Sequence, residues 1–269
     1  MAALVASLCI LIGGQAVGEE TSPSTNWTVT AGGGVAEVAS RDEAGSPLAY
    51  SGVGYPLILR VDAVGPRWAA GGQTGLFVFG LNGGRLSADL AREGEPSHRA
   101  DSLFVDLSAW IDRQVLTGSA HRLWLGAQVG HWTFFRSYLY NPAQIGSVES
   151  WEAVITADVR AGMGGDYGRL SWELAASVPL LGWMMRPSYA VRGDERVEIV
   201  ESHTTVLRRG RAVTVDRLQM VQGEASVALA LGQRWGLRGE YRAGRLSYTN
   251  FVQTRAFVQR GTLGVSLRF

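Results

Sequence analysis

Hydrophobic and polar residues alternate with a period of two along most of this chain of 269 residues. Glycine, proline and aspartate interrupt the alternation at intervals, as in a series of β-strands joined by turns. The alternation predicts ten strands, at about residues 27–40, 48–64, 68–82, 101–114, 120–136, 149–163, 168–182, 215–231, 235–248 and 255–269. Several of these segments have about 14 to 17 residues, whereas a globular strand usually has about 5 or 6.

The connections between the predicted strands alternate in length. Tight turns follow every second strand, with the sequences GPRW, TGSA, GDYG and GQRW at 65–68, 117–120, 165–168 and 232–235. Longer polar links at 41–47, 82–100, 137–148 and 183–214 join most of the other strands. Short turns at one end and long loops at the other are typical of membrane-spanning barrels, whose tilted strands need about 9–11 residues to cross the hydrocarbon.

The two faces of the predicted strands differ in chemistry. In the segment 149–163, Ile155 and Val159 share one face, and Asp158 and Arg160 share the other. No helical pattern or second domain is available to cover the apolar face, so lipid is its better partner and the charged face points inward. The barrel must be closed, because an open edge in hydrocarbon leaves unpaired backbone groups. The sequence therefore predicts an all-β fold: a single antiparallel transmembrane β-barrel of about ten strands over residues 27–269, with short periplasmic turns and longer extracellular loops.

Strand parity also selects the charged side chains that point into the lumen. They are Arg60, Asp62, Asp106, Asp112, Arg122, Glu152, Asp158, Arg160, Arg169, Glu173, Glu224, Arg238, Glu240, Arg242, Arg260 and Arg268. Eight arginines balance eight acids in this set. Ten strands enclose a narrower space than barrels of about sixteen strands, so we expect these charges to pair and fill the lumen. A small-solute channel is the alternative, although a selective pore more often carries charges of one sign.

Composition and charge exclude some classes of function. The formal net charge is +1, so the chain lacks the basic surface expected of a protein that binds nucleic acid. No metal-ligand spacing, nucleotide-binding glycine pattern or cysteine pair occurs, so we expect neither a metal nor a cofactor. The apolar start, which contains the only cysteine, Cys9, predicts a signal peptide over residues 1–18 and a periplasmic segment over 19–26. The start lacks the usual positive charge, and a buried helix is the alternative interpretation.

The final segment, GTLGVSLRF at 261–269, alternates strictly and ends on an aromatic residue. Together with the signal-like start, the alternating strands and the alternating loop lengths, it resembles the bacterial outer-membrane β-barrel proteins as a class, without matching one particular family. The resemblance implies a location in the bacterial outer membrane, outer-membrane lipid around the barrel, and recognition of Phe269 by the barrel-assembly machinery during biogenesis. The extracellular partner, if the long loops contact one, is not identified by the sequence.

One pair of residues is a candidate for catalysis. His131 and Thr133 are two residues apart on the predicted strand 120–136 and therefore share its outer face. The pair resembles the exterior His-x-Ser pair of outer-membrane phospholipases and lipid A deacylases, although threonine replaces serine. Glu149 is the candidate orienting acid if the neighbouring strand brings it close.

The simpler interpretation is that His131 belongs to an aromatic belt with Trp132, Phe134 and Phe135. Omptin-type proteases also form barrels of this strand number, but their paired-acid and His-Asp motifs do not align with the sequence. We therefore favour a non-enzymatic barrel with a narrow, charge-networked lumen and extracellular loops for surface contact. A lipid hydrolase that uses His131 and Thr133 is the minority alternative.

Overall fold

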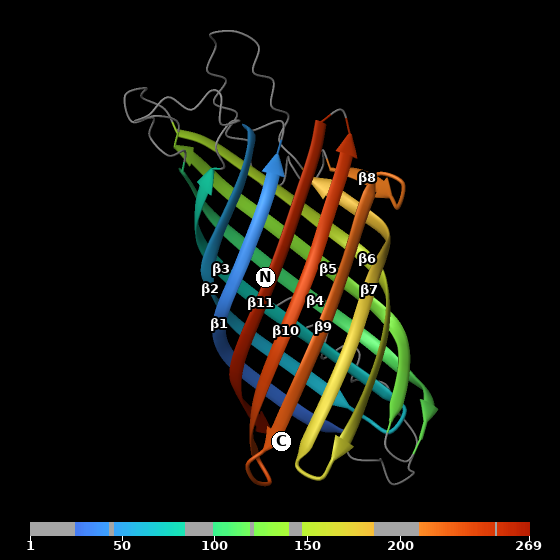
Figure 1. Cartoon of the computed structure of the whole chain (residues 1–269). Coiled ribbons are helices and arrows are strands. Elements are labelled where there is room, and N and C mark those ends of the chain that lie inside the picture. Colours follow the sequence, from blue (N-terminus) through green and yellow to red (C-terminus); the bar gives the residue numbers. More distant parts are fainter. Residues whose placement is uncertain are drawn as a thin grey trace.

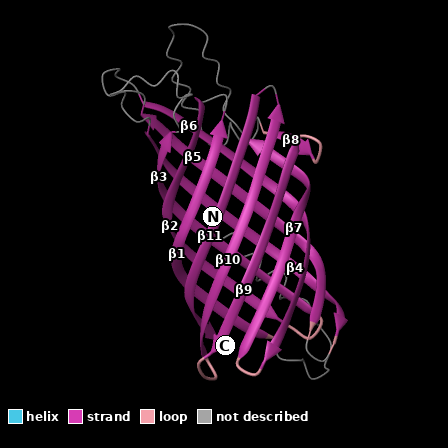
Figure 2. Cartoon of the chain, viewed as in Figure 1, coloured by secondary structure: helices cyan, strands magenta, loops and turns pink. Residues whose placement is uncertain are grey.

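The computed structural model describes residues 25–42, 46–83, 99–118, 121–139, 147–185, 210–250 and 252–269. The strands are β1 (Asn26–Asp42), β2 (Ser46–Val64), β3 (Trp68–Gly83), β4 (Arg99–Thr117), β5 (Arg122–Leu139), β6 (Ser147–Tyr167), β7 (Leu170–Met185), β8 (Arg211–Thr214), β9 (Leu218–Ala230), β10 (Trp235–Asn250) and β11 (Val252–Arg268). Every described element in Figure 2 is a strand or a short connection. In these ranges, no helix is long and apolar enough to cross a membrane.

The strands close into a barrel, because β6 pairs with β7 and β1 pairs with β11 (Figure 1). Around the wall the order is β1, β2, β3, β4, β5, β6, β7, β9, β10 and β11, and all neighbours are antiparallel. The short β8 shares one wall position with β9: it pairs with residues 181–184 of β7, whereas β9 pairs with residues 170–177. The prediction of a closed antiparallel barrel with ten wall positions is confirmed. The predicted strand 215–231 is different in detail, since it begins at Leu218 after a turn over 215–217.

The two ends of the barrel differ, as the connection lengths predict. At one end, which we call the turn end, Gly65 N donates to Trp68 O at 2.8 Å and Leu231 N donates to Trp235 O at 2.9 Å. In the turn between β6 and β7, Gly168 has a φ of 62°, a left-handed conformation that favours glycine. The start of β1 and the end of β11 also lie at the turn end.

The opposite end, which we call the loop end, carries the longer connections. Most residues of these connections lie outside the described ranges, as do the predicted signal peptide at 1–18 and nearly all of the predicted segment at 19–26.

Side chains alternate between the outer wall and the lumen along each strand. Large apolar residues occupy the outer wall, where Leu57 is 69% exposed and Leu263 is 64% exposed. The alternation shifts in β7 at a bulge: Asp158 pairs with Pro179 and the preceding residue of β6 pairs with Leu181. Leu180 and Leu181 consequently both face outward.

Candidate functional site

The lumen is filled by two layers of side chains. The layer nearer the turn end, which we call the charge layer, consists of Arg60, Asp62, Asp106, Asp112, Asp158, Arg160, Glu173, Glu224, Arg238, Glu240, Arg242 and Arg260. The layer nearer the loop end, which we call the apolar layer, consists of Ala36, Val38, Tyr50, Ile58, Phe77, Phe79, Leu81, Phe104, Trp132, Phe134, Val154, Met184, Val213, Leu218, Met220, Leu246, Tyr248, Ala256 and Val258. The pairing register separates the two, because Val258 of β11 precedes Arg260 on the way to the turn end.

Arg60 of β2 forms ion pairs with four acids of the charge layer, and only 1% of its surface is exposed. Its guanidinium lies 2.9 Å from Asp62 on the same strand and also contacts Glu224 of β9. It lies 3.3 Å from Glu240 of β10 and 3.6 Å from Glu173 of β7. Since β2 and β7 are five positions apart in either direction around the ring, the Arg60–Glu173 contact crosses the full width of the lumen.

Asp106 of β4 makes a second crossing. Its Oδ2 accepts a hydrogen bond from Arg260 at 2.7 Å and another from Arg242 of β10 at 3.1 Å. β4 and β10 are also five positions apart in either direction. Glu240 joins the two crossings, because it lies 3.1 Å from Arg260 as well as 3.3 Å from Arg60. One connected network of charges therefore spans the lumen.

Trp110 of β4 lies between two arginines of this network. The distance from its ring centroid is 4.6 Å to Arg60 Cζ and 5.2 Å to Arg160 Cζ. Desolvated contacts of this kind stabilise the cation over the aromatic face. Trp110 was not among the predicted luminal residues, although strand parity identifies it. Its even-numbered position between Asp106 and Asp112 puts it on the same inward face.

Four of the predicted luminal charges lie outside the charge layer. Glu152 lies on the loop side of the apolar layer and pairs with Arg136 at 2.8 Å. Arg122 makes a partly exposed ion pair at the turn end, and Arg169 and Arg268 are exposed at the same end. The prediction of a luminal network is wrong for these three arginines, because they stand at strand ends where water reaches the side chains.

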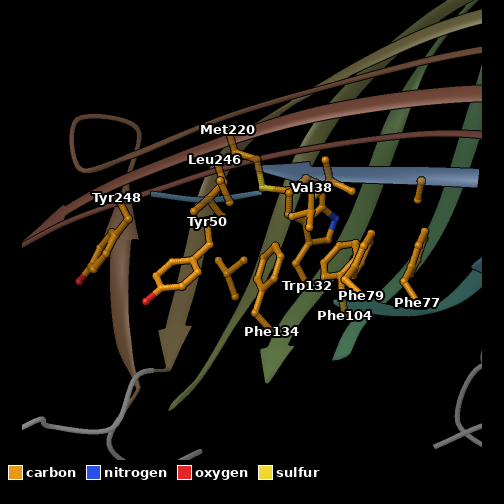
Figure 3. Close-up of a cluster of buried hydrophobic side chains, with 14 of the residues drawn as sticks. Val38, Tyr50, Phe77, Phe79, Phe104, Trp132, Phe134, Met220, Leu246 and Tyr248 are labelled. Carbon is orange, nitrogen blue, oxygen red and sulfur yellow. The ribbon is translucent and has the colours of Figure 1, made fainter. Parts of the chain in front are cut away.

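The side chains of the apolar layer pack together inside the barrel (Figure 3). The ring of Phe104 lies 5.0 Å from that of Phe77 and 4.5 Å from that of Phe134, measured between centroids. The indole of Trp132 packs edge-on against Phe104 at 5.4 Å. Arg260 Cζ lies 5.4 Å from the Phe77 centroid, so the two layers are in direct contact.

Trp132 extends from β5 across the lumen to the backbone of β10. A Cβ at Gly244 would collide with Cη2 of Trp132, so glycine permits this close approach. The apolar layer was not predicted from the sequence, because the inward faces were identified from their charges. The available signal was LFVFGL at 76–81, which is apolar on both faces, as expected for a strand buried on both sides.

The outer wall carries the candidate catalytic pair. His131 Nε2 and Thr133 Oγ1 are joined by a hydrogen bond of 2.7 Å. Glu149 does not accompany them, because it pairs with Ser137, whereas Thr133 pairs with Ala153. The prediction for Glu149 is wrong because the register between β5 and β6 places this acid four residues along β6 from Ala153, the partner of Thr133.

The chemistry available to the pair is that of a base beside a hydroxyl group. Within the described ranges, no carboxylate is hydrogen-bonded to the His131 ring. The same ranges contain no group of three or more His, Cys, Asp or Glu side chains that could hold a metal ion.

Comparisons with known proteins identify the fold. No family model matches the chain, and no curated protein matches its sequence. The chain is similar to the outer membrane protease OmpT from Escherichia coli, with 11% identity, a TM-score of 0.54, and coverage of 93% of this chain and 99% of that one. It also matches the translocator domain of the autotransporter NalP from Neisseria meningitidis, with 13% identity, a TM-score of 0.45, and coverage of 100% and 94%. The chain thus has the fold of bacterial outer-membrane β-barrels.

Proposed function

We propose that this chain is an integral protein of the bacterial outer membrane whose lumen is closed, and that it acts through its lipid-facing wall and its extracellular loops. The observation that carries this proposal is the pair of contacts between diametrically opposite strands. Arg60 meets Glu173 at 3.6 Å, and Arg242 meets Asp106 at 3.1 Å. Side chains that touch across the full diameter occupy the path that a solute would need.

The outer wall supports the membrane location. Apolar side chains such as Leu57 and Leu263 would form a large exposed patch in water, whereas lipid covers such a surface. Trp27, Trp68 and Trp235 are all exposed and gather near the turn end. Tryptophans in this position are typical of the aromatic belt at a membrane interface.

The proposal is tested by extraction and by conductance. The protein should leave membranes only with detergent, and the folded barrel should add no conductance to a planar lipid bilayer. Discrete conductance steps from the wild-type protein would favour the small-solute channel instead. A chain that is monomeric and folded without detergent would contradict the membrane location.

Biogenesis belongs to the same proposal: residues 1–18 are removed on export and Phe269 is read by the barrel-assembly machinery. The Phe269 side chain is 70% exposed, and its backbone N donates to Trp27 O at 2.9 Å. An exposed aromatic on an anchored backbone is accessible to another protein. Deletion of Phe269 should reduce assembly in cells more than folding into detergent micelles; an equal loss in both would indicate a packing role.

A second candidate function is lipid hydrolysis, favoured by the 2.7 Å hydrogen bond between His131 and Thr133 on the outer wall. It predicts release of fatty acid from phospholipid vesicles by the wild type, lost in His131→Ala and in Thr133→Ala. His121→Ala is the matched control, because this exposed histidine lies at the turn end, beside Trp172. Absence of fatty-acid release from the wild type would leave His131 and Thr133 as wall residues.

A further inference from the structure

Three exposed arginines gather on the outer wall near the loop end. They are Arg41 of β1, Arg255 of β11 and Arg245 of β10. Arg41 pairs directly with Arg255, and Arg245 pairs with Phe257, two residues farther along β11. Arg245 and Arg255 lie diagonally on the same face of the paired strands β10 and β11, and an anion between them would offset the repulsion of their charges.

A groove of about 660 Å³ lies among these arginines. It is hollow because small residues, Ala39, Ala49 and Ser51, occupy the outward positions around Arg41. Phe257 stands opposite Ala39 and forms an apolar side of the groove. The groove therefore combines guanidinium groups with an apolar surface, which are the two surfaces that a phosphorylated lipid requires.

The position of the arginines along the barrel axis matches the expected level of the lipid headgroups. Trp235 lies at the turn end of β10, and Arg245 lies ten residues farther along the same strand and faces the same side. With a rise of about 3.3 Å per residue and a tilt of about 40°, these ten residues span about 25 Å, the height of the apolar band of an outer-membrane barrel. If Trp235 marks one interface, Arg245 marks the other, where the phosphates of the outer leaflet lie.

Two of the three arginines, Arg245 and Arg255, make no ion pair in the part of the chain that the structure describes. Arg41 already has an interaction of its own, so the proposed site consists of Arg245 and Arg255. The acid Glu37 also faces outward, two residues from Ala39. Its Oε2 accepts a hydrogen bond from Gln259 Nε2 at 2.7 Å, so this carboxylate has a partner other than the arginines.

We propose that Arg245 and Arg255, with the groove beside them, bind the phosphate of an anionic lipid in the outer leaflet. Guanidinium groups bind phosphate oxygens in a bidentate manner, and the long stems of arginine let the charge reach the headgroup region while the stem covers apolar surface. This inference rests on the proposed membrane location and adds a lipid class that the barrel selects.

The test compares lipid binding by native mass spectrometry in neutral detergent. The probes are dioleoyl phosphatidic acid, dioleoyl phosphatidylcholine and inorganic phosphate. Arg245→Gln/Arg255→Gln is the test variant, and Arg67→Gln/Arg234→Gln removes the same charge from exposed positions at the turn end. Wild type and control should prefer phosphatidic acid, whereas the test variant should bind it about thirtyfold more weakly, the effect of two basic side chains near an anionic surface.

Several results would contradict the proposed lipid site. They are equal binding of the two lipids by the wild type, an equal loss in the control variant, or full competition by millimolar inorganic phosphate. Heat-modifiable migration on gels shows whether each variant is folded. A folded, detergent-dependent barrel without lipid preference would refute only this inference, whereas a chain that is folded and monomeric without detergent would refute the membrane location itself.

Discussion

At the scale of single residues, the charge layer depends on acids such as Glu240 that have more than one basic partner. Glu240 lies 3.3 Å from Arg60 and 3.1 Å from Arg260, and it accepts a hydrogen bond from Gln73 at 2.9 Å. Such pairing mainly avoids uncompensated buried charge and adds little net stability. Removal of one partner should therefore lower the free energy of unfolding by more than the intact ion pair raises it.

Glu240→Gln should destabilise the folded barrel by about 3–5 kcal/mol, because it leaves buried arginines short of one negative charge. Urea titration of tryptophan fluorescence in lipid vesicles measures this change in the free energy of unfolding. Asp166→Asn is the control, since the Arg122–Asp166 pair is partly exposed and should contribute at most about 1 kcal/mol. Similar small losses in both variants would show that the charge layer is hydrated and weakly coupled.

Gly244→Ala should destabilise the barrel by about 1–3 kcal/mol, because the added methyl group meets the Trp132 indole. The penalty should shrink in a Trp132→Phe background, where the shorter ring leaves space. Gly223→Ala on the neighbouring strand is the control, since a Cβ there meets nothing within 4 Å. If the Gly244→Ala penalty is the same with phenylalanine at 132, the indole does not cross the lumen as described.

At the scale of elements, the sequence predicts the strands well because each strand has two chemically different faces. Long alternation over 149–163 could be recognised as β6 from its apolar and charged positions alone. The break between β8 and β9 could not, because it depends on a local hydrogen bond from the Thr214 hydroxyl to Asp216 in the turn over 215–217. Strand ends were also missed, since main-chain pairing continues after the alternation weakens.

Val227→Arg tests the lipid-facing wall. Val227 of β9 pairs with Gly239, four residues from Trp235, which places it about 10 Å inside the apolar band. Arginine at this depth should cost about 2–4 kcal/mol, measured by reversible unfolding in vesicles. Val115→Arg, at the turn end of β4 and two residues beyond outward Arg113, should cost about 1 kcal/mol or less. Equal costs would contradict the depth assigned to Val227.

At the scale of the whole molecule, the sequence predicted only one of the two layers of side chains inside the lumen. Charged residues at inward positions, such as Arg60 and Glu240, are conspicuous because a lipid-facing wall excludes them. Inward Phe77 and Phe104 resemble their outward apolar neighbours, so parity alone does not identify an apolar filling. Their role depends on contacts between distant strands, and these contacts follow from barrel closure rather than from local pattern.

The two layers lie in series along the barrel axis, and each should block ions without the other. Arg60→Ser/Glu224→Ser removes a contacting cation and anion from the charge layer, and Phe104→Ala/Trp132→Ala removes two rings from the apolar layer. Because the intact layer still fills the lumen, neither double variant should conduct in a planar bilayer. The quadruple variant should conduct, since water and ions then have a continuous path. Conductance by Arg60→Ser/Glu224→Ser alone would show that the apolar layer does not seal, and a silent but folded quadruple variant would show that further side chains close the barrel.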